Sequence, residues 1–162
     1  MGGLASVCIG RRKTGKTTLT KRLLEKSKLK KVIYDINQEY KDFYDKPFVD
    51  FNVFLDKIVE LKNSHIVIEE ATIFFRQRSQ AEQMINLLVR ARHTGNIIQL
   101  NFHSFKSVPK DIYNLLDYVT ILKTNDSLKD VKDKFDNKDI IKAFEEARES
   151  KNPYFNKTVS LY

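Results

Sequence analysis

The sequence has little of what marks secreted, fibrous or membrane-spanning proteins. Its 162 residues include one cysteine, Cys8, so no internal disulfide can form, and a reducing cytoplasm is the expected compartment. No apolar run approaches the roughly 20 residues that a membrane helix needs, and the start of the chain lacks the pattern of a secretory signal. Prolines number three and glycines five, and neither a linker nor a repeat is present. We therefore expect one domain over residues 1–162 and no membrane partner.

Positive charge is concentrated in two segments of the chain. There are 29 basic and 21 acidic residues, which gives a net charge of +8. Residues 1–31 carry ten basic side chains and one acidic one, and residues 76–110 carry six and one. This distribution favours polyanionic partners such as nucleotides or nucleic acids. For residues 21–31, a helix face that is simply solvated by lysines is an equally good explanation.

Short apolar strands alternate with amphipathic helices along the sequence. The expected strands are 4–9, 31–35, 66–68, 96–101, 118–122 and a closing edge strand at 154–162. The expected helices are 15–27, 50–63, 79–95, 109–116, 126–135 and 137–149. Ser79 and Glu82 have the spacing of a capping box at the start of the third helix. The alternation predicts an α/β fold with a mainly parallel sheet, covered on both faces, that binds ligands beyond the carboxyl ends of its strands.

A phosphate-binding loop follows the first expected strand. Residues 10–17 match the pattern G-x-x-x-x-G-K-[ST] at every position. Its glycines let backbone amides turn toward a phosphate, and the N-terminus of the next helix adds partial positive charge. Lys16 is expected to reach the β- and γ-phosphates, and the Thr17 hydroxyl to ligate Mg²⁺. The expected nucleotide-binding residues are Gly10, Arg11, Arg12, Lys13, Thr14, Gly15, Lys16, Thr17 and Thr18.

Two carboxylates, Glu69 and Glu70, end the third expected strand. In a phosphate-loop fold, the first acid of such a pair helps to hold the Mg²⁺ shell, and the second orients and deprotonates the attacking water. We therefore expect Glu69 at the metal and Glu70 at the water. Aspartate is the usual residue at the metal position, so the longer side chain of Glu69 departs from the pattern. A pair of solvated acids at a strand end is the alternative.

Polar residues also end the fourth expected strand. If this strand lies between the first and the third, its end lies beside the γ-phosphate. Asn101, His103 or Ser104 is then placed to sense the phosphate or to position water, and His103 is our choice. The alternative is a histidine in a surface loop.

Four arginines lie between residues 76 and 92. Negative charge develops on the γ-oxygens during phosphoryl transfer, and the fixed fork of an arginine from a neighbouring subunit can neutralise it. Arg90 and Arg92 are the candidates for this role, because their helix ends there and opens toward the fourth strand. Arg76 and Arg78 are equally able to contact DNA phosphates. A plain surface position is the alternative for each of the four.

The motifs, taken in order, resemble the FtsK–HerA superfamily of DNA-pumping ATPases. Besides the phosphate loop and the acidic strand end, residues 35–40 resemble its D-x-x-x-E-Y element, and residues 90–95 resemble the region after its acidic strand. His103 stands where a strand-end glutamine is common in that family. The resemblance covers roughly residues 4–124. It implies an additional-strand P-loop fold with sheet order 5-1-4-3-2, and assembly into a pentameric or hexameric ring.

The expected function is Mg²⁺-dependent ATP hydrolysis that drives translocation or packaging of double-stranded DNA by a homo-oligomeric ring. The short chain resembles the minimal packaging ATPases of viruses, or a mobile-element relative, so a capsid or portal protein is a candidate partner. A small nucleotide kinase is the alternative enzyme, although kinases need no water-activating acid such as Glu70. A nucleotide-dependent switch is a third reading. Residues 123–126 do not match the guanine-reading element [NT]-K-x-D, so ATP is preferred to GTP.

Overall fold

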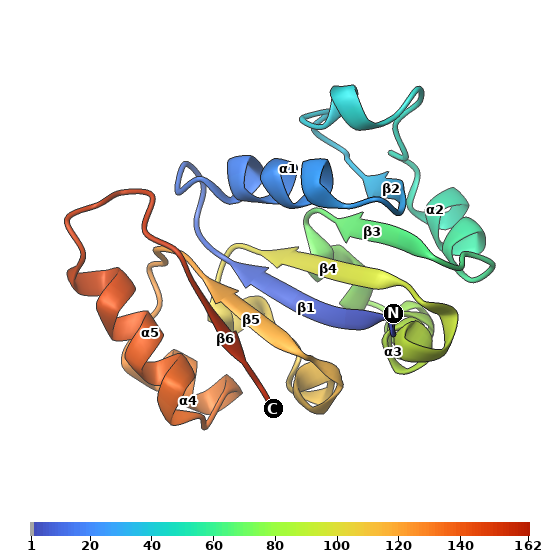
Figure 1. The fold of residues 1–162 in the computed structure, drawn as a ribbon. Coiled ribbons are helices and arrows are strands. Elements are labelled where there is room, and N and C mark those ends of the chain that lie inside the picture. The colour runs from blue at the N-terminus through green and yellow to red at the C-terminus, as the bar shows by residue number, and fades with distance from the viewer. Residues whose placement is uncertain (1) are drawn as a thin grey trace.

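A six-stranded sheet with the order β2-β3-β4-β1-β5-β6 forms the centre of the computed structural model, which describes residues 2–162 (Figure 1). The strands are β1 (Leu4–Ile9), β2 (Lys30–Tyr34), β3 (Ser64–Ile68), β4 (Ile97–Phe102), β5 (Tyr118–Ile121) and β6 (Lys157–Ser160). The first five run parallel, and β6 pairs antiparallel with β5. Read from β5, the parallel strands have the order 5-1-4-3-2 that the resemblance implied, with the expected edge strand beside them.

Helices cover both faces of the sheet, which gives the three layers expected from the sequence (Figure 1). The helix α1 lies on one face, and α3, α4 and α5 lie on the other. The helices are α1 (Lys16–Lys26), α2 (Phe51–Ile58), α3 (Arg78–Thr94), α4 (Leu128–Lys134) and α5 (Lys138–Glu149). Within residues 2–162, no helix combines the length and the apolar character needed to cross a membrane.

Two local expectations are corrected by the structure. Helix α3 begins at Arg78, so Ser79 lies inside it, and Gln77 occupies the N-cap without a side-chain hydrogen bond. Glu82 pairs with Arg78 instead of capping the helix. The expected helix 109–116 is a six-residue 3₁₀ helix, Lys110–Leu115, with Pro109 as its N-cap.

Successive side chains of each strand point to opposite faces of the sheet, so the protein has two apolar cores, a large one and a small one. One face of the sheet packs its apolar side chains beneath α3, α4 and α5. On the other face, Leu24 of α1 packs with Ile33, Tyr40 and Val67 in a second cluster. Because parallel strands end at the same edge, the loops after β1, β2, β3 and β4 meet there. This edge holds every residue of the site described next.

Candidate active site

The phosphate loop has the backbone conformation that its glycines allow. Gly15, the N-cap of α1, adopts φ 91°, in the left-handed region that favours glycine. A Cβ atom on Gly10 would lie 2.8 Å from the Cβ of Leu122, so this position has no room for a side chain. Lys13 also has positive φ, at 64°. The loop therefore curls between β1 and α1 in a shape that a generic sequence would not adopt.

Lys16 points back across this loop. Its ammonium donates to the Gly10 carbonyl at 3.3 Å, and its side chain is buried. The Thr14 hydroxyl donates to the Arg11 carbonyl at 2.8 Å, which closes the loop from within. A charged ammonium held over a curl of backbone amides is a ready anion site. The geometry suits the β- and γ-phosphates of a nucleotide.

A cavity of about 660 Å³ opens above the loop, a size suited to a nucleotide. It brings together most of the residues that the sequence indicated, and Gly10 and Thr14 lie buried in the loop behind it. Asn37, Glu39 and Tyr154 also line it, although the sequence had not singled them out as site residues. The full lining is Arg11, Arg12, Lys13, Gly15, Lys16, Thr17, Thr18, Asn37, Glu39, Glu69, Glu70, His103 and Tyr154.

Glu69 is held from two sides at the end of β3. Its Oε1 accepts from Asn101 Nδ2 at 2.6 Å and from the Tyr40 hydroxyl. Burial raises the pKa of Glu69 above its ordinary value, while the two hydrogen bonds and the charge of Lys16 oppose that rise. Burial and the nearby carboxylate also raise the pKa of Tyr40, so its hydroxyl stays a proton donor. Glu69 is thus a positioned carboxylate, not a solvated one.

Glu70, the next residue, has a strained backbone. Its φ of 51° and ψ of 44° lie in the left-handed region, which is rare for a residue other than glycine. The turn aims its side chain at β4, where Glu70 Oε1 lies 2.7 Å from Nε2 of His103. Both side chains are half-buried and line the cavity. Such strain concentrates at functional sites, where the surrounding fold holds it in place.

The three polar residues predicted at the end of the fourth strand thus have different partners. Asn101 contacts Glu69, and His103 contacts Glu70. Ser104 caps the 3₁₀ helix Phe105–Ser107 and does not line the cavity. The Asn101 carbonyl oxygen accepts in turn from Gln99, which also donates to the Thr20 hydroxyl of α1. Two buried amides along β4 therefore support Glu69, whereas Glu70 is supported by His103.

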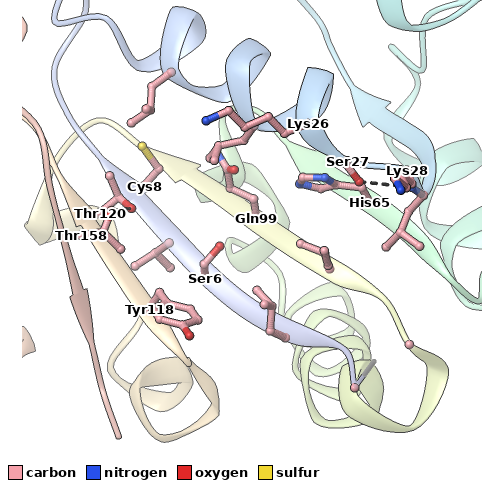
Figure 2. Close-up of a pocket in the computed structure, with 18 of the residues that line it drawn as sticks. Ser6, Cys8, Lys26, Ser27, Lys28, His65, Gln99, Tyr118, Thr120 and Thr158 are labelled. Carbon is pink, nitrogen blue, oxygen red and sulfur yellow. Dashed lines mark hydrogen bonds between the residues drawn. The ribbon is translucent and has the colours of Figure 1, made fainter.

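A larger cavity of about 860 Å³ lies beside this row, between α1 and the same face of the sheet (Figure 2). Gln99, His65 and Cys8 are among its lining residues, together with Lys26 and Lys28 at the end of α1 (Figure 2). Burial raises the pKa of the Cys8 thiol to about 12, so it is not a nucleophile at neutral pH.

Both candidate arginine fingers lie outside the cavity. Arg92 donates to Asp117 Oδ1 at 2.6 Å and to the Tyr162 hydroxyl. Asp117 precedes the first residue of β5, whereas the phosphate loop follows the last residue of β1. Because the two strands are parallel, the contact lies at the opposite end of the strands from the phosphate loop. Arg90 is exposed near the same end of α3. Arg76 and Arg78 are exposed where α3 begins, closer to the acid pair in the chain.

No protein-family model and no curated protein sequence matches the chain. Several solved structures do. B204, the DNA-packaging ATPase from Sulfolobus Turreted Icosahedral Virus, superposes with a TM-score of 0.77 at 21% identity over 99% of this chain and 94% of its own. The genome packaging NTPase B204 from Sulfolobus turreted icosahedral virus 2, in complex with ATP-gammaS, gives 0.77 at 19% identity over 98% and 92%.

A bacterial structure is similar over a smaller part of the chain. The N-terminal domain of zonular occludens toxin from Neisseria meningitidis gives a TM-score of 0.56 at 15% identity, over 77% of this chain and 79% of its own. At these identities the likeness establishes the fold. The chain has the P-loop NTPase fold that the sequence predicted.

Proposed function

We propose that this protein is a Mg²⁺-dependent ATPase that drives translocation or packaging of double-stranded DNA as a homo-oligomeric ring. The observation that carries the proposal is the meeting of Lys16, Glu69 and Glu70 at one cavity, within a fold that matches a DNA-packaging ATPase over nearly its full length. The neighbours with bound AMPPCP and ATP-gammaS support ATP as the nucleotide.

Five residues of the site have assigned roles in this proposal. Lys16 binds the β- and γ-phosphates, and Glu70 accepts a proton from the attacking water. His103 holds the Glu70 carboxylate in its strained position. The hydroxyl of Thr17 and the carboxylate of Glu69 are hard oxygen donors, which suit Mg²⁺. When bound with ATP, the ion would neutralise charge on the phosphate oxygens.

Tyr154 is the candidate for contact with the adenine base. The side chain is 62% exposed, and its ring lies beside Gly15 at the edge of the cavity. An exposed aromatic ring offers a flat apolar face on which a base can stack. The aromatic side chain of Tyr154 thus extends the site beyond the residues that bind the phosphates.

The ring assembly would bring a neighbour's arginine to this site. Arg90 and Arg92 lie away from their own cavity, so only another subunit places them over a γ-phosphate. The exposed basic residues on α1 and directly after it suit the DNA backbone, whose binding would then weaken steeply with salt; they are Arg22, Lys26, Lys28 and Lys30. This DNA contact needs charge but no base-reading module.

The deciding experiment measures ATP hydrolysis with and without double-stranded DNA, using Glu70→Gln as the inactive reference. We expect hydrolysis that DNA stimulates and that the variant lacks. Transfer of the γ-phosphate to a nucleoside monophosphate would instead identify a kinase. Nucleotide binding without turnover, in the presence of DNA, would favour a switch.

A further inference from the structure

The loop after β2 places a third carboxylate, that of Glu39, at the nucleotide cavity beside Glu69 and Glu70. The position of Glu39 is fixed by Asp35. Asp35, which is fully buried, accepts from the backbone amides of Glu39 at 2.9 Å and Tyr40 at 2.8 Å. The Tyr44 hydroxyl donates to the same carboxylate at 2.7 Å. One buried side chain therefore fixes the backbone at two successive residues, so Glu39 and Tyr40 are held in a set register against the site.

Glu39 and Tyr40 each contact one of the two residues predicted to bind the metal. Glu39 Oε2 accepts from the Thr17 hydroxyl at 3.3 Å, and the side chain lines the cavity. Tyr40 donates to Glu69 from the buried side. A short segment thus contacts both Thr17 of the phosphate loop and Glu69 of β3, the two residues to which the sequence assigned the metal.

The environments of Glu39 and Glu69 differ in a way that matters for a cation. Glu69 is 6% exposed, and its Oε1 already accepts two hydrogen bonds. Glu39 is exposed, and within residues 2–162 it forms no salt bridge. Within the described residues, its carboxylate thus forms no ion pair, and it stands beside a hydroxyl suited to Mg²⁺. Magnesium is held by few carboxylates, with phosphate oxygens and waters completing its octahedron.

We propose that Glu39 is a further member of the magnesium site, contributing its carboxylate to the oxygen shell of the ion beside Thr17; this inference rests on the proposed ATPase function. Tyr40 is a positioning residue, because its hydrogen bond fixes the carboxylate of Glu69, the other acid of the site. Glu69 stands where aspartate is usual, and its side chain, longer by one methylene, needs such a partner to hold it in place.

The test compares the affinity for AMPPCP, measured by calorimetry, in Mg²⁺ and in EDTA. In Glu39→Gln we expect the gain in affinity that Mg²⁺ provides to shrink by about 10-fold, or about 1.4 kcal/mol. Affinity in EDTA should stay the same or rise, because a negative charge near the phosphates has been removed. Glu25→Gln is the matched control, since it removes the same charge from an exposed position on α1 and should change neither value.

Two further measurements keep the proposal falsifiable. Glu39→Asp keeps the charge on a shorter side chain and should retain part of the Mg²⁺ gain. A Mn²⁺ titration followed by electron paramagnetic resonance should show weaker binding of the ion with AMPPCP in Glu39→Gln. An unchanged Mg²⁺ gain in Glu39→Gln, or an equal loss in Mg²⁺ and EDTA, would overturn the proposal. Neither readout uses hydrolysis or DNA, so failure of the motor function is seen separately.

Discussion

Nε2 of His103 lies 2.7 Å from Oε1 of Glu70, and this contact joins the ends of β4 and β3 across the mouth of the nucleotide cavity. The pairing gives the strained Glu70 backbone a partner that holds its carboxylate in one direction. In the proposed function, the histidine at the polar end of β4 therefore acts through the acid that it orients.

The first prediction distinguishes the role of Glu70, the proposed base, from that of His103, which orients it. Glu70→Gln keeps the shape of the side chain but cannot accept a proton, so hydrolysis should fall by about 10²-fold or more while ATP affinity stays near that of the parent. His103→Ala should lower kcat less than this and leave ATP affinity unchanged. His103→Gln, which still offers a hydrogen-bond donor, should recover most of the loss. Steady-state ATPase assays and nucleotide titrations measure both quantities, and a Glu70→Gln protein with the parent rate would remove Glu70 from its role.

The second prediction concerns the hydroxyl of Tyr40. Tyr40→Phe removes only the donor to Glu69, and we expect kcat to fall by about 10- to 100-fold, as for other partners that orient a metal ligand, with little change in KM for ATP. Tyr113→Phe is the control, because it removes a half-buried phenol that contacts Asn137 far from the site. In a Glu69→Ala background, Tyr40→Phe should have little further effect, since the pair then has no interaction to lose. Fully additive losses in kcat would mean that the hydroxyl acts elsewhere.

The motifs of the site were predictable from the sequence because each one is local. The phosphate loop is eight consecutive residues with a fixed spacing, and Glu69 and Glu70 follow directly from a readable apolar strand. The resemblance then supplied the order of the strands. Neither step required a contact between side chains to be known.

The contacts that complete the site were not predictable in this way. Tyr40 and Glu69 are 29 residues apart, and Thr17 and Glu39 are 22 apart, so both contacts depend on the path of a loop with no regular structure. The only signal was the pattern of residues 35–40, which suggested a family but not a role. The predicted capping box at Ser79 was wrong although its signal is local, because α3 begins one residue earlier and Glu82 pairs with Arg78.

The third prediction is a dependence of stability on pH that His65 causes. Burial, with a smaller effect from Lys31, lowers the pKa of His65 from 6.5 to about 4. The unfolded chain therefore binds a proton at this residue between about pH 6.5 and pH 4, whereas the folded chain does not. The free energy of unfolding should fall as the pH falls through this window, by about 3 kcal/mol at most.

Denaturant unfolding of the parent and His65→Gln across this range measures the effect. The variant should lose this part of the pH dependence, while His93→Gln, at an exposed position of α3, should keep it. Glu69 contributes with the opposite sign, because its raised pKa favours the folded state at lower pH. That contribution is present in all three proteins and cancels in the comparison. Parallel pH profiles for the parent and His65→Gln would contradict the prediction.

The fourth prediction is that the two candidate finger arginines differ in their effect on stability. Asp117 is 2% exposed, and its carboxylate accepts from both Arg92 and the amide of Ala5. Arg92→Ala leaves this buried acid without its cation and should cost about 1–3 kcal/mol. Arg90→Ala changes an exposed side chain and should stay within about 0.5 kcal/mol of the parent. Thermal unfolding distinguishes the two, and equal melting temperatures would remove the structural role of Arg92.

This difference decides how a shared active site can be tested. If Arg92→Ala is inactive, the result is ambiguous, because activity can be lost through destabilisation of the structure around Asp117. If Arg90→Ala is inactive but stable, it has lost an interaction of the transition state.

Mixing Arg90→Ala with Glu70→Gln creates interfaces in which an intact Glu70 faces an intact Arg90 of the neighbour. We expect ATPase activity to return on mixing, with ATP binding intact in both variants. If no activity returns in mixed assemblies verified by mass, Arg90 is not donated between subunits. The same mixture made with Arg92→Ala, at a temperature where that variant is fully folded, then tests the remaining candidate.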